Sequence, residues 1–312
     1  MSQAAGAPLV AVVAPLLLGG ASTNPQVSFL YPQGPIAAAQ QEHIFVVMLL
    51  LCIVVVPVLI VTPIFAWRYR YSNASSRYTP RWSFSWPLEI AIWGVPLAIV
   101  TALAVWLAQD TAGLDPYRPL SSGEPLRVQV IGYDWKWLFI YPDYRIASMG
   151  ELAIPVSRQV AFELTSDTVL QSFFIPALGS QIYAMPGMKT LLHLQASSPG
   201  VMRGENTQYN GEDFEKQKFA VKAMSERDFD AWVRRVQSEG VPMTPATYRV
   251  VQLRNSLDAT IEALGSRGAP LGVLYFSGVS PDLFSDVVQS FHHSSHGSTV
   301  ERIWTGAARP PE

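Results

Sequence analysis

The sequence has a single cysteine, Cys52, among its 312 residues. Neither a disulfide nor a metal site with two cysteine ligands can therefore form within the chain. Charged residues are also scarce, at 15% against 49% hydrophobic residues, and this balance predicts a membrane-embedded part. The net charge of −2 provides no electrostatic footprint for nucleic acid. The length suffices for one large domain or two modest ones with sizeable cores.

Two stretches, residues 44–67 and 90–108, contain 24 and 19 residues without a charge. A helix needs about 20 apolar residues to cross the hydrocarbon core of a bilayer. We therefore predict a transmembrane helical hairpin over residues 23–112, with spans at about 44–67 and 88–109. Prolines within the runs are expected to kink these helices at Pro57, Pro63 and Pro96.

The charges that flank the two runs predict an orientation. The loop between them carries four arginines, no acidic residue precedes Glu89 in it, and acidic residues flank the outer ends. By the positive-inside rule this loop is cytoplasmic. Both termini and everything after Asp110 are therefore expected on the external side of the membrane. The four arginines are Arg68, Arg70, Arg77 and Arg81.

Residues 9–22, LVAVVAPLLLGGAS, have the apolar core of a signal peptide followed by small residues, although no Lys or Arg precedes them. We interpret residues 1–22 as a signal peptide cleaved after Ala21, and a retained segment is the alternative. A lipoprotein signal would end on a cysteine, whereas Leu18-Gly19-Gly20 is followed by Ala21. The sequence therefore argues against a lipidated N-terminus.

Beyond a linker rich in Pro, Gly and Ser, residues 113–224 change to a period of two. Apolar and polar residues alternate over 127–130, 159–164 and 218–222, and turns rich in Gly and Pro separate the alternating stretches. Short strands of this kind predict a β-sandwich. We interpret the aromatic segment 133–144, YDWKWLFIYPDY, as a core strand with large rings.

The stretch TVLQSFFIPALGSQIYAMPGM (168–188) predicts a strand, a turn and a second strand that ends at Pro186-Gly187. Such a frame could hold a metal, yet it contains no His, Cys, Asp or Glu. A strand methionine or histidine in an apolar run is more often part of the core than a metal ligand. We interpret three residues of this region as core: Met185, Met188 and His193.

After residue 224 the apolar residues follow a helical period. Residues 225–228 have the form of a capping box, and Thr244-Pro245 and Ser280-Pro281 have the form of helix starts. We therefore predict a small helical, aromatic-rich appendage over residues 225–291. Residues 292–312 are polar and predict a disordered tail. We interpret the cluster His292-His293-x-x-His296 as part of that solvated tail, with adventitious metal binding as the alternative.

Four features occur in order along residues 27–291. The first is the pair of apolar runs. The other three are the motifs DWKWLFIYP (134–142), SFFIPALGSQIYAMPGM (172–188) and YFSGVSPDLFSDVV (275–288). Together they resemble subunit II of haem–copper terminal oxidases, in particular of the proteobacterial cytochrome bo-type ubiquinol oxidases. The resemblance implies a cupredoxin fold for the external domain, in agreement with the sandwich. The expected fold class is an α+β membrane protein with a two-helix transmembrane hairpin, an external cupredoxin-like β-sandwich and a small C-terminal helical appendage.

Members of this family that oxidise cytochrome c carry a binuclear copper centre in this domain. Its ligands are a His at the head of a strand and a Cys-x-Glu-x-Cys-Gly-x-x-His-x-x-Met loop. The corresponding loop here is NTQYNGEDFEKQ (206–217), which retains only Gly211 of that pattern. No cysteine follows Cys52, so the thiolate bridge that suits copper cannot be built. The lost ligand positions are Gln171, Asn206, Gln208, Asn210, Phe214 and Gln217.

The resemblance then implies that ubiquinol delivers electrons from the bilayer directly to subunit I, and that the complex reduces O2 to water and pumps protons. It implies no cofactor in this chain, with the haems and active-site copper in subunit I. This chain would assemble and cap subunit I in a bacterial inner membrane, beside smaller subunits III and IV and without cytochrome c. Trp135 matches the aromatic residue that accepts electrons from cytochrome c in copper-bearing relatives. Here we expect Trp135 and Trp137 to be structural.

Glu89 stands at the cytoplasmic start of the second run. In the resembled family a Glu at this place lies at the mouth of a proton-uptake channel into subunit I, and ionisable groups at membrane depth tend to mark ion paths. The alternative is an ordinary glutamate favoured by the helix dipole. Two rival functions are a non-enzymatic, membrane-anchored assembly or binding module, and a copper-containing cytochrome c oxidase subunit, which the cysteine count argues against.

Overall fold

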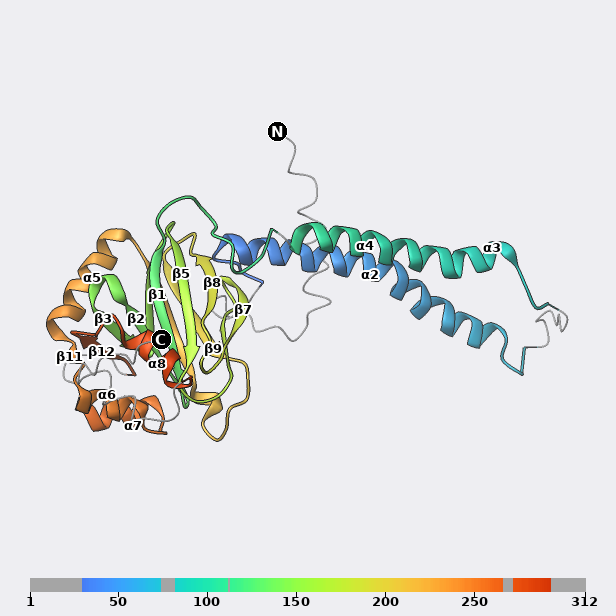
Figure 1. The fold of residues 1–312 in the computed structure, drawn as a ribbon. Coiled ribbons are helices and arrows are strands. Elements are labelled where there is room, and N and C mark those ends of the chain that lie inside the picture. The colour runs from blue at the N-terminus through green and yellow to red at the C-terminus, as the bar shows by residue number, and fades with distance from the viewer. Residues whose placement is uncertain (1–29, 74–81, 112, 266–271, 293–312) are drawn as a thin grey trace. The chain divides into compact units, whose positions relative to one another are not determined.

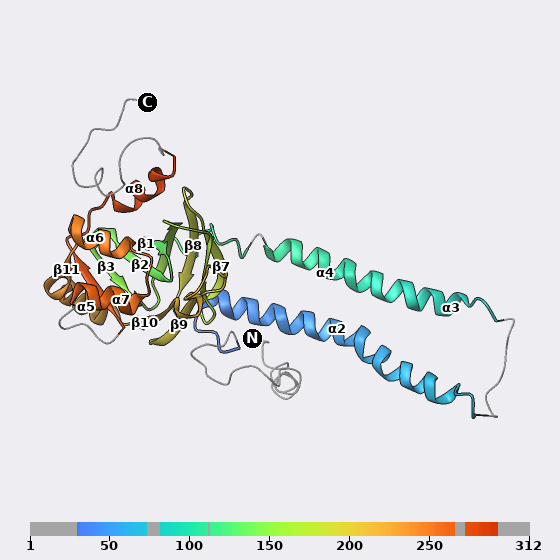
Figure 2. The same ribbon diagram turned by 90° about the horizontal axis from the view of Figure 1, so that it is seen from below.

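The structure is a computed structural model that describes residues 30–73, 82–111, 113–265 and 272–292. The chain divides into a helical unit and a β-rich unit (Figure 1, Figure 2). The predicted signal peptide and nearly all of the predicted tail, together with Arg77 and Arg81, lie outside the described residues.

Two long apolar helices form the helical unit. The first, α2 (Pro35–Arg68), continues through Pro57 and Pro63 and bends along its length (Figure 1). The second runs over 26 residues and consists of α3 (Trp86–Glu89), the π-helical turn η1 (Ile90–Gly94) and α4 (Val95–Thr111). Both are long and apolar enough to cross a membrane, with mean hydropathies of 3.5 and 2.2.

A polar contact joins the two helices. His43 Nε2 lies 2.7 Å from Asp110 Oδ2, and the His43 ring meets the Trp106 ring edge-on at 4.9 Å. Because His43 and Asp110 adjoin the ends of the two uncharged runs, these contacts set the register of the helices there.

Two sheets pack face to face in the β-rich unit. The seven-stranded sheet has the order β11-β12-β3-β2-β1-β5-β8, and the five-stranded sheet has the order β4-β10-β9-β6-β7. Rings from both sheets fill the space between them, with the centroids of Trp137, Phe173 and Phe219 5.4–6.5 Å apart. The strands are β1 (Leu126–Tyr133), β2 (Lys136–Tyr141), β3 (Ile146–Met149), β4 (Glu151–Pro155), β5 (Gln159–Ser166), β6 (Gln171–Ile175), β7 (Gly179–Ala184), β8 (Thr190–Gln195), β9 (Gly200–Asn206), β10 (Lys218–Met224), β11 (Val241–Pro242) and β12 (Leu274–Ser277).

The strands predicted from alternation are present as β1, β5 and β10, and the stretch 168–188 forms β6, a turn and β7. The segment 133–144 differs from its prediction, because it is not one strand. It contains the end of β1, a tight turn, all of β2 and a 3-10 turn, η2 (Pro142–Tyr144). Trp135 occupies the tight turn with a φ of 59°, a left-handed conformation that is uncommon for a residue with a large side chain.

The C-terminal segment is not purely helical, contrary to its prediction. Its strand β12 pairs with β3 and extends the seven-stranded sheet. The last three of its helices bury a second apolar cluster against the outer face of that sheet, with Tyr248, Val251 and Phe284 among its members, whereas the first helix packs Phe229 and Trp232 into the main core cluster. The helices are α5 (Glu226–Glu239), α6 (Pro245–Gln252), α7 (Leu257–Leu264) and α8 (Leu283–Ser290).

Side-chain caps explain where these helices begin. The hydroxyl of Ser225 accepts from the Asp228 N–H at 3.2 Å, and Thr244 does the same for Thr247, as predicted. The predicted start at Ser280-Pro281 is wrong, because α8 begins at Leu283 after the N-cap Asp282. Ser280 instead accepts from the N–H of Asp282 at 3.3 Å, which forms a turn before the helix.

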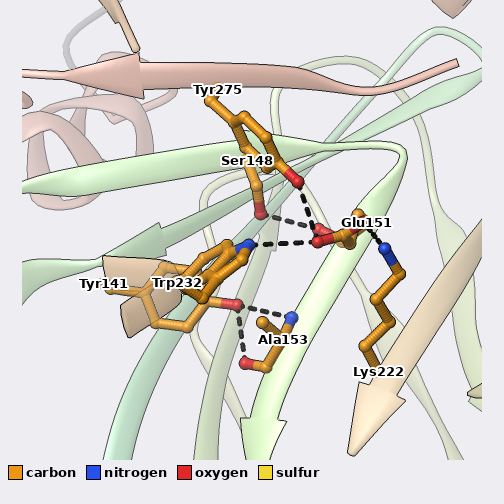
Figure 3. Close-up of polar contacts among 7 residues, drawn as sticks. All are labelled: Tyr141, Ser148, Glu151, Ala153, Lys222, Trp232 and Tyr275. Carbon is orange, nitrogen blue, oxygen red and sulfur yellow. Dashed lines mark hydrogen bonds and ion pairs between the residues drawn. The ribbon is translucent and has the colours of Figure 1, made fainter. Parts of the chain in front are cut away.

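A buried carboxylate ties the C-terminal segment to the sandwich (Figure 3). Glu151, at the start of β4, is 1% exposed. Its Oε1 accepts from Trp232 Nε1 of α5 at 3.0 Å and from the Tyr275 hydroxyl of β12 at 2.9 Å. Its Oε2 lies 2.6 Å from Nζ of Lys222 in β10. The carboxylate of Glu151 thus links β4 to α5, β12 and β10.

Candidate functional site

Four carboxamide side chains meet where β6 begins and β9 ends. Gln171 opens β6, Asn206 closes β9, and Asn210 and Gln217 belong to the loop before β10. Gln217 Nε2 donates to Gln171 Oε1 at 2.5 Å. Asn206 Nδ2 and Asn210 Nδ2 both donate to Gln217 Oε1, at 2.9 and 2.7 Å. The structure thus brings together four of the six positions that the resemblance assigns to lost copper ligands, and we call this group the amide cluster.

The amide cluster also pairs with the backbone around it. Gln171 Nε2 donates to the carbonyl of Tyr133 at 2.9 Å. Asn206 Oδ1 accepts from the backbone N–H groups of Ser172 and Gln208, each at 2.9 Å. Buried backbone groups almost always have hydrogen-bond partners. These side chains therefore supply the hydrogen bonds that a neighbouring strand would otherwise supply to this backbone.

Two glycines make room for the amide cluster. A Cβ at Gly132 would lie 2.5 Å from Gln171 Oε1, so any larger residue would displace that side chain. Gly211 has a φ of 116°, in a region that residues with a side chain rarely adopt, and it lies beside the Trp135 ring. The one residue of the copper-loop pattern that this chain retains therefore has a backbone role.

The donor set does not fit a binuclear copper centre. Amide groups are neutral, and the cluster has no thiolate, imidazole or thioether, which are the ligands suited to that metal. Gln208 contacts the cluster only through its backbone, and Phe214 packs on Tyr209 with ring centroids 5.7 Å apart. Throughout the described part of the chain, no group of three or more His, Cys, Asp or Glu is placed to hold a metal ion.

Trp135 packs beneath the loop between α6 and α7. It is 6% exposed, and the guanidinium of Arg254 lies 5.2 Å from its ring centroid. Its neighbour in the sequence, Lys136, is 2% exposed and donates to Leu253 O, Asn255 O and Asn255 Oδ1 at 2.5–3.0 Å. Burial lowers the pKa of Lys136 to about 8. The lysine thus holds the C-terminal end of α6 against the turn that carries Trp135.

Trp137 lies in the core between the sheets, 2% exposed and edge-on to Phe173 at 5.6 Å. His193 is also buried, with Nδ1 3.1 Å from the carbonyl of Pro116. Met188, by contrast, is 52% exposed, so its assignment to the core is wrong. Met188 follows Gly187, whose φ of 70° turns the chain out of the sheet.

Glu89 belongs to the helical unit, as the last residue of α3 in the first turn of the second apolar helix. Its side chain is half-buried, and its Oε2 accepts from Trp93 Nε1 at 3.1 Å. The turn between these two residues is π-helical.

Sequence reasoning missed three buried or half-buried charges: Lys136, Glu151 and Asp167. Each stands within or directly beside an apolar strand, and that placement is the signal that could have identified them. Burial raises the pKa of Asp167 to about 6, and Gln252 Nε2 donates to this carboxylate at 3.3 Å.

The β-sandwich with an amide cluster at the ligand-loop position, preceded by two apolar helices, defines a membrane-anchored protein with a cupredoxin-like domain. Residues 146–224 match the family model described as cytochrome c oxidase subunit II, periplasmic domain. This match confirms the predicted fold class.

Relatives of similar length extend the assignment to the whole chain. Ubiquinol oxidase subunit 2 of Acetobacter aceti is 40% identical over 281 residues, which is 89% of this chain and 86% of the relative. Cytochrome bo(3) ubiquinol oxidase subunit 2 of Pseudomonas putida is 40% identical over 283 residues, 90% of this chain and 85% of the relative. The chain belongs to the ubiquinol oxidase subunit 2 family, which confirms the resemblance found in the sequence.

A solved structure of the periplasmic domain of cytochrome oxidase subunit II from Bradyrhizobium japonicum is 22% identical, with a TM-score of 0.35. It covers 36% of this chain and 95% of that domain.

Proposed function

We propose that this chain acts as subunit II of a ubiquinol oxidase that oxidises ubiquinol, reduces O2 to water and pumps protons. The relatives named as ubiquinol oxidase subunit 2 support this role. In this proposal the haems and the active-site copper belong to a multispan subunit I, and smaller subunits III and IV complete the complex. The chain spans a bacterial inner membrane twice and carries its β-rich unit in the periplasm.

The amide cluster is the observation that carries the proposal. Carboxamides have no accessible second oxidation state, and those of Gln171, Asn206, Asn210 and Gln217 are already hydrogen-bonded to one another. An electron from a soluble donor therefore has no acceptor at this place. A donor dissolved in the bilayer does not need one, because it can reduce subunit I directly. The β-rich unit then assembles and caps subunit I, and Trp135 and Trp137 serve its packing.

The test is to purify the complex in detergent through a tag on this chain. We expect haem-bearing subunit I to co-purify, ubiquinol to be oxidised with O2 uptake, and reduced cytochrome c to remain reduced. Copper per complex should match the single active-site atom of subunit I. Purification without a haem-bearing partner would overturn the proposal, and so would oxidation of cytochrome c at a rate comparable with that of ubiquinol.

We further propose that Glu89 collects protons for subunit I at the cytoplasmic end of the second span. Its position in the first turn of an apolar helix, half-buried even within this chain, supports that role. Glu89→Gln keeps the shape of the side chain and removes its charge, so we expect ubiquinol oxidation per haem to fall several-fold. Glu42→Gln, beside the other end of the hairpin, is the matched control and should leave turnover unchanged. Wild-type turnover of Glu89→Gln would end the proposed role.

A further inference from the structure

The π-helical turn η1 follows Glu89 directly and precedes Pro96 by two residues. Proline lacks an N–H, and its ring crowds the carbonyl four residues earlier, which here belongs to Ile92 within the turn. Spanning helices accommodate proline through local π-helical adjustments of this kind. Such turns are rare, and they are frequently found at functional sites.

Trp93 bridges this turn back to Glu89. Its Nε1 donates to Glu89 Oε2 at 3.1 Å. An indole N–H can only donate, so this contact always presents a hydrogen to the carboxylate. Among the described side chains, Trp93 is the one that donates to Glu89. Next to a bilayer the local dielectric constant is low, and a hydrogen bond to a charged group is stronger there than in water.

We propose that Trp93 is a positioning residue for Glu89: it holds the carboxylate along the helix surface in the orientation from which protons pass to subunit I. The proline-dependent turn sets the spacing between the two side chains. This inference rests on the proposed proton-collecting role of Glu89.

The test uses Trp93→Phe in the purified complex, which retains an aromatic ring and removes the N–H. We expect ubiquinol oxidation per haem to fall several-fold. The pH at which turnover is half maximal should also move by about half a unit or more, because a hydrogen bond to an ionisable group is removed. The control is Trp86→Phe in the same helix, whose ring lies edge-on to Phe84 at 5.3 Å, and it should change neither quantity.

A double variant separates positioning from a general loss of structure. If Trp93 acts through Glu89, the Glu89→Gln, Trp93→Phe double variant turns over at the rate of Glu89→Gln alone. A further loss in the double variant would overturn the proposal, as would a Trp93→Phe complex with the wild-type pH profile per haem. Either of those two results would leave the proposed role of Glu89 standing. If Glu89→Gln turns over at the wild-type rate, both that role and this inference are wrong.

Discussion

Glu151→Gln is expected to weaken the attachment of the C-terminal segment to the sandwich. The change keeps the size of the side chain, and it leaves one oxygen for the two donors, Trp232 Nε1 and the Tyr275 hydroxyl. A hydrogen bond to a charged group contributes about 1.5–3 kcal/mol and a neutral one about 0.5–1.5 kcal/mol, so each bond loses about 1 kcal/mol. Lys222 is 36% exposed, and the loss of its ion pair adds at most about 1 kcal/mol. The free energy of unfolding should therefore fall by about 2–3 kcal/mol.

The assay is thermal and urea unfolding of the full chain in detergent, followed by tryptophan fluorescence. At about 2–4 °C per kcal/mol for a unit of this size, a loss of about 2–3 kcal/mol should lower the midpoint by about 4–12 °C. Glu163→Gln is the matched control. This carboxylate pairs with the half-exposed Lys189 at 3.0 Å and accepts from Gln129 Nε2 at 3.2 Å, a bond that the oxygen of the new Gln can keep, so the change should cost at most about 1 kcal/mol. If Glu151→Gln unfolds at the same midpoint as Glu163→Gln, the buried carboxylate does not hold the segment and the reasoning is refuted.

Three further substitutions test other parts of the β-rich unit by the same unfolding assay. Burial raises the pKa of Asp167 from 3.8 to about 6. Between these pH values the folded chain binds more protons than the unfolded chain, so stability is lost as the pH rises through about 6. Asp167→Asn should therefore raise the free energy of unfolding by about 1–3 kcal/mol at pH 7.5 and leave it unchanged at pH 3.5. Gln217→Leu removes the hydrogen bonds that Gln217 makes to three other amides and should lower that free energy by about 3 kcal/mol, and a neutral result would contradict the network. Ser225→Ala removes the cap of α5 and should cost about 1 kcal/mol, whereas an unchanged midpoint would show that the cap contributes nothing.

The fold follows from the sequence where a repeating pattern exists. Uncharged runs of sufficient length predicted the two long helices, and the alternation of apolar and polar residues predicted β1, β5 and β10. The pairing of β12 with β3 had no such signal, because the paired residues Ser277 and Ile146 lie 131 residues apart in the sequence, farther than any local pattern extends. The π-helical turn was also unforeseen, since Pro96 predicted a distortion but not its form.

The candidate site was predictable in its composition and not in its contacts. The positions Gln171, Asn206, Asn210 and Gln217 could be named from the ligand pattern, yet nothing in that pattern says that their amides pair with each other. Glu151 was missed because its partners, Trp232 and Tyr275, come from elements far away in the sequence. Local periodicity cannot reveal a contact whose members lie 81 and 124 residues apart.

Amides at the positions that the resemblance assigns to lost copper ligands have a physical advantage. The frame presents buried backbone groups to this space, among them the carbonyl of Tyr133 and the N–H of Ser172. Apolar side chains would fill the volume but leave these groups without partners, at about 1–3 kcal/mol each. A carboxylate could accept from the N–H but not donate to the carbonyl, a cation could do only the reverse, and either would be buried without a counter-ion. A carboxamide has both donors and an acceptor and carries no charge, so amides such as Gln171 and Asn206 can pair with the backbone and with each other. The frame can thus keep its loops in place without a metal.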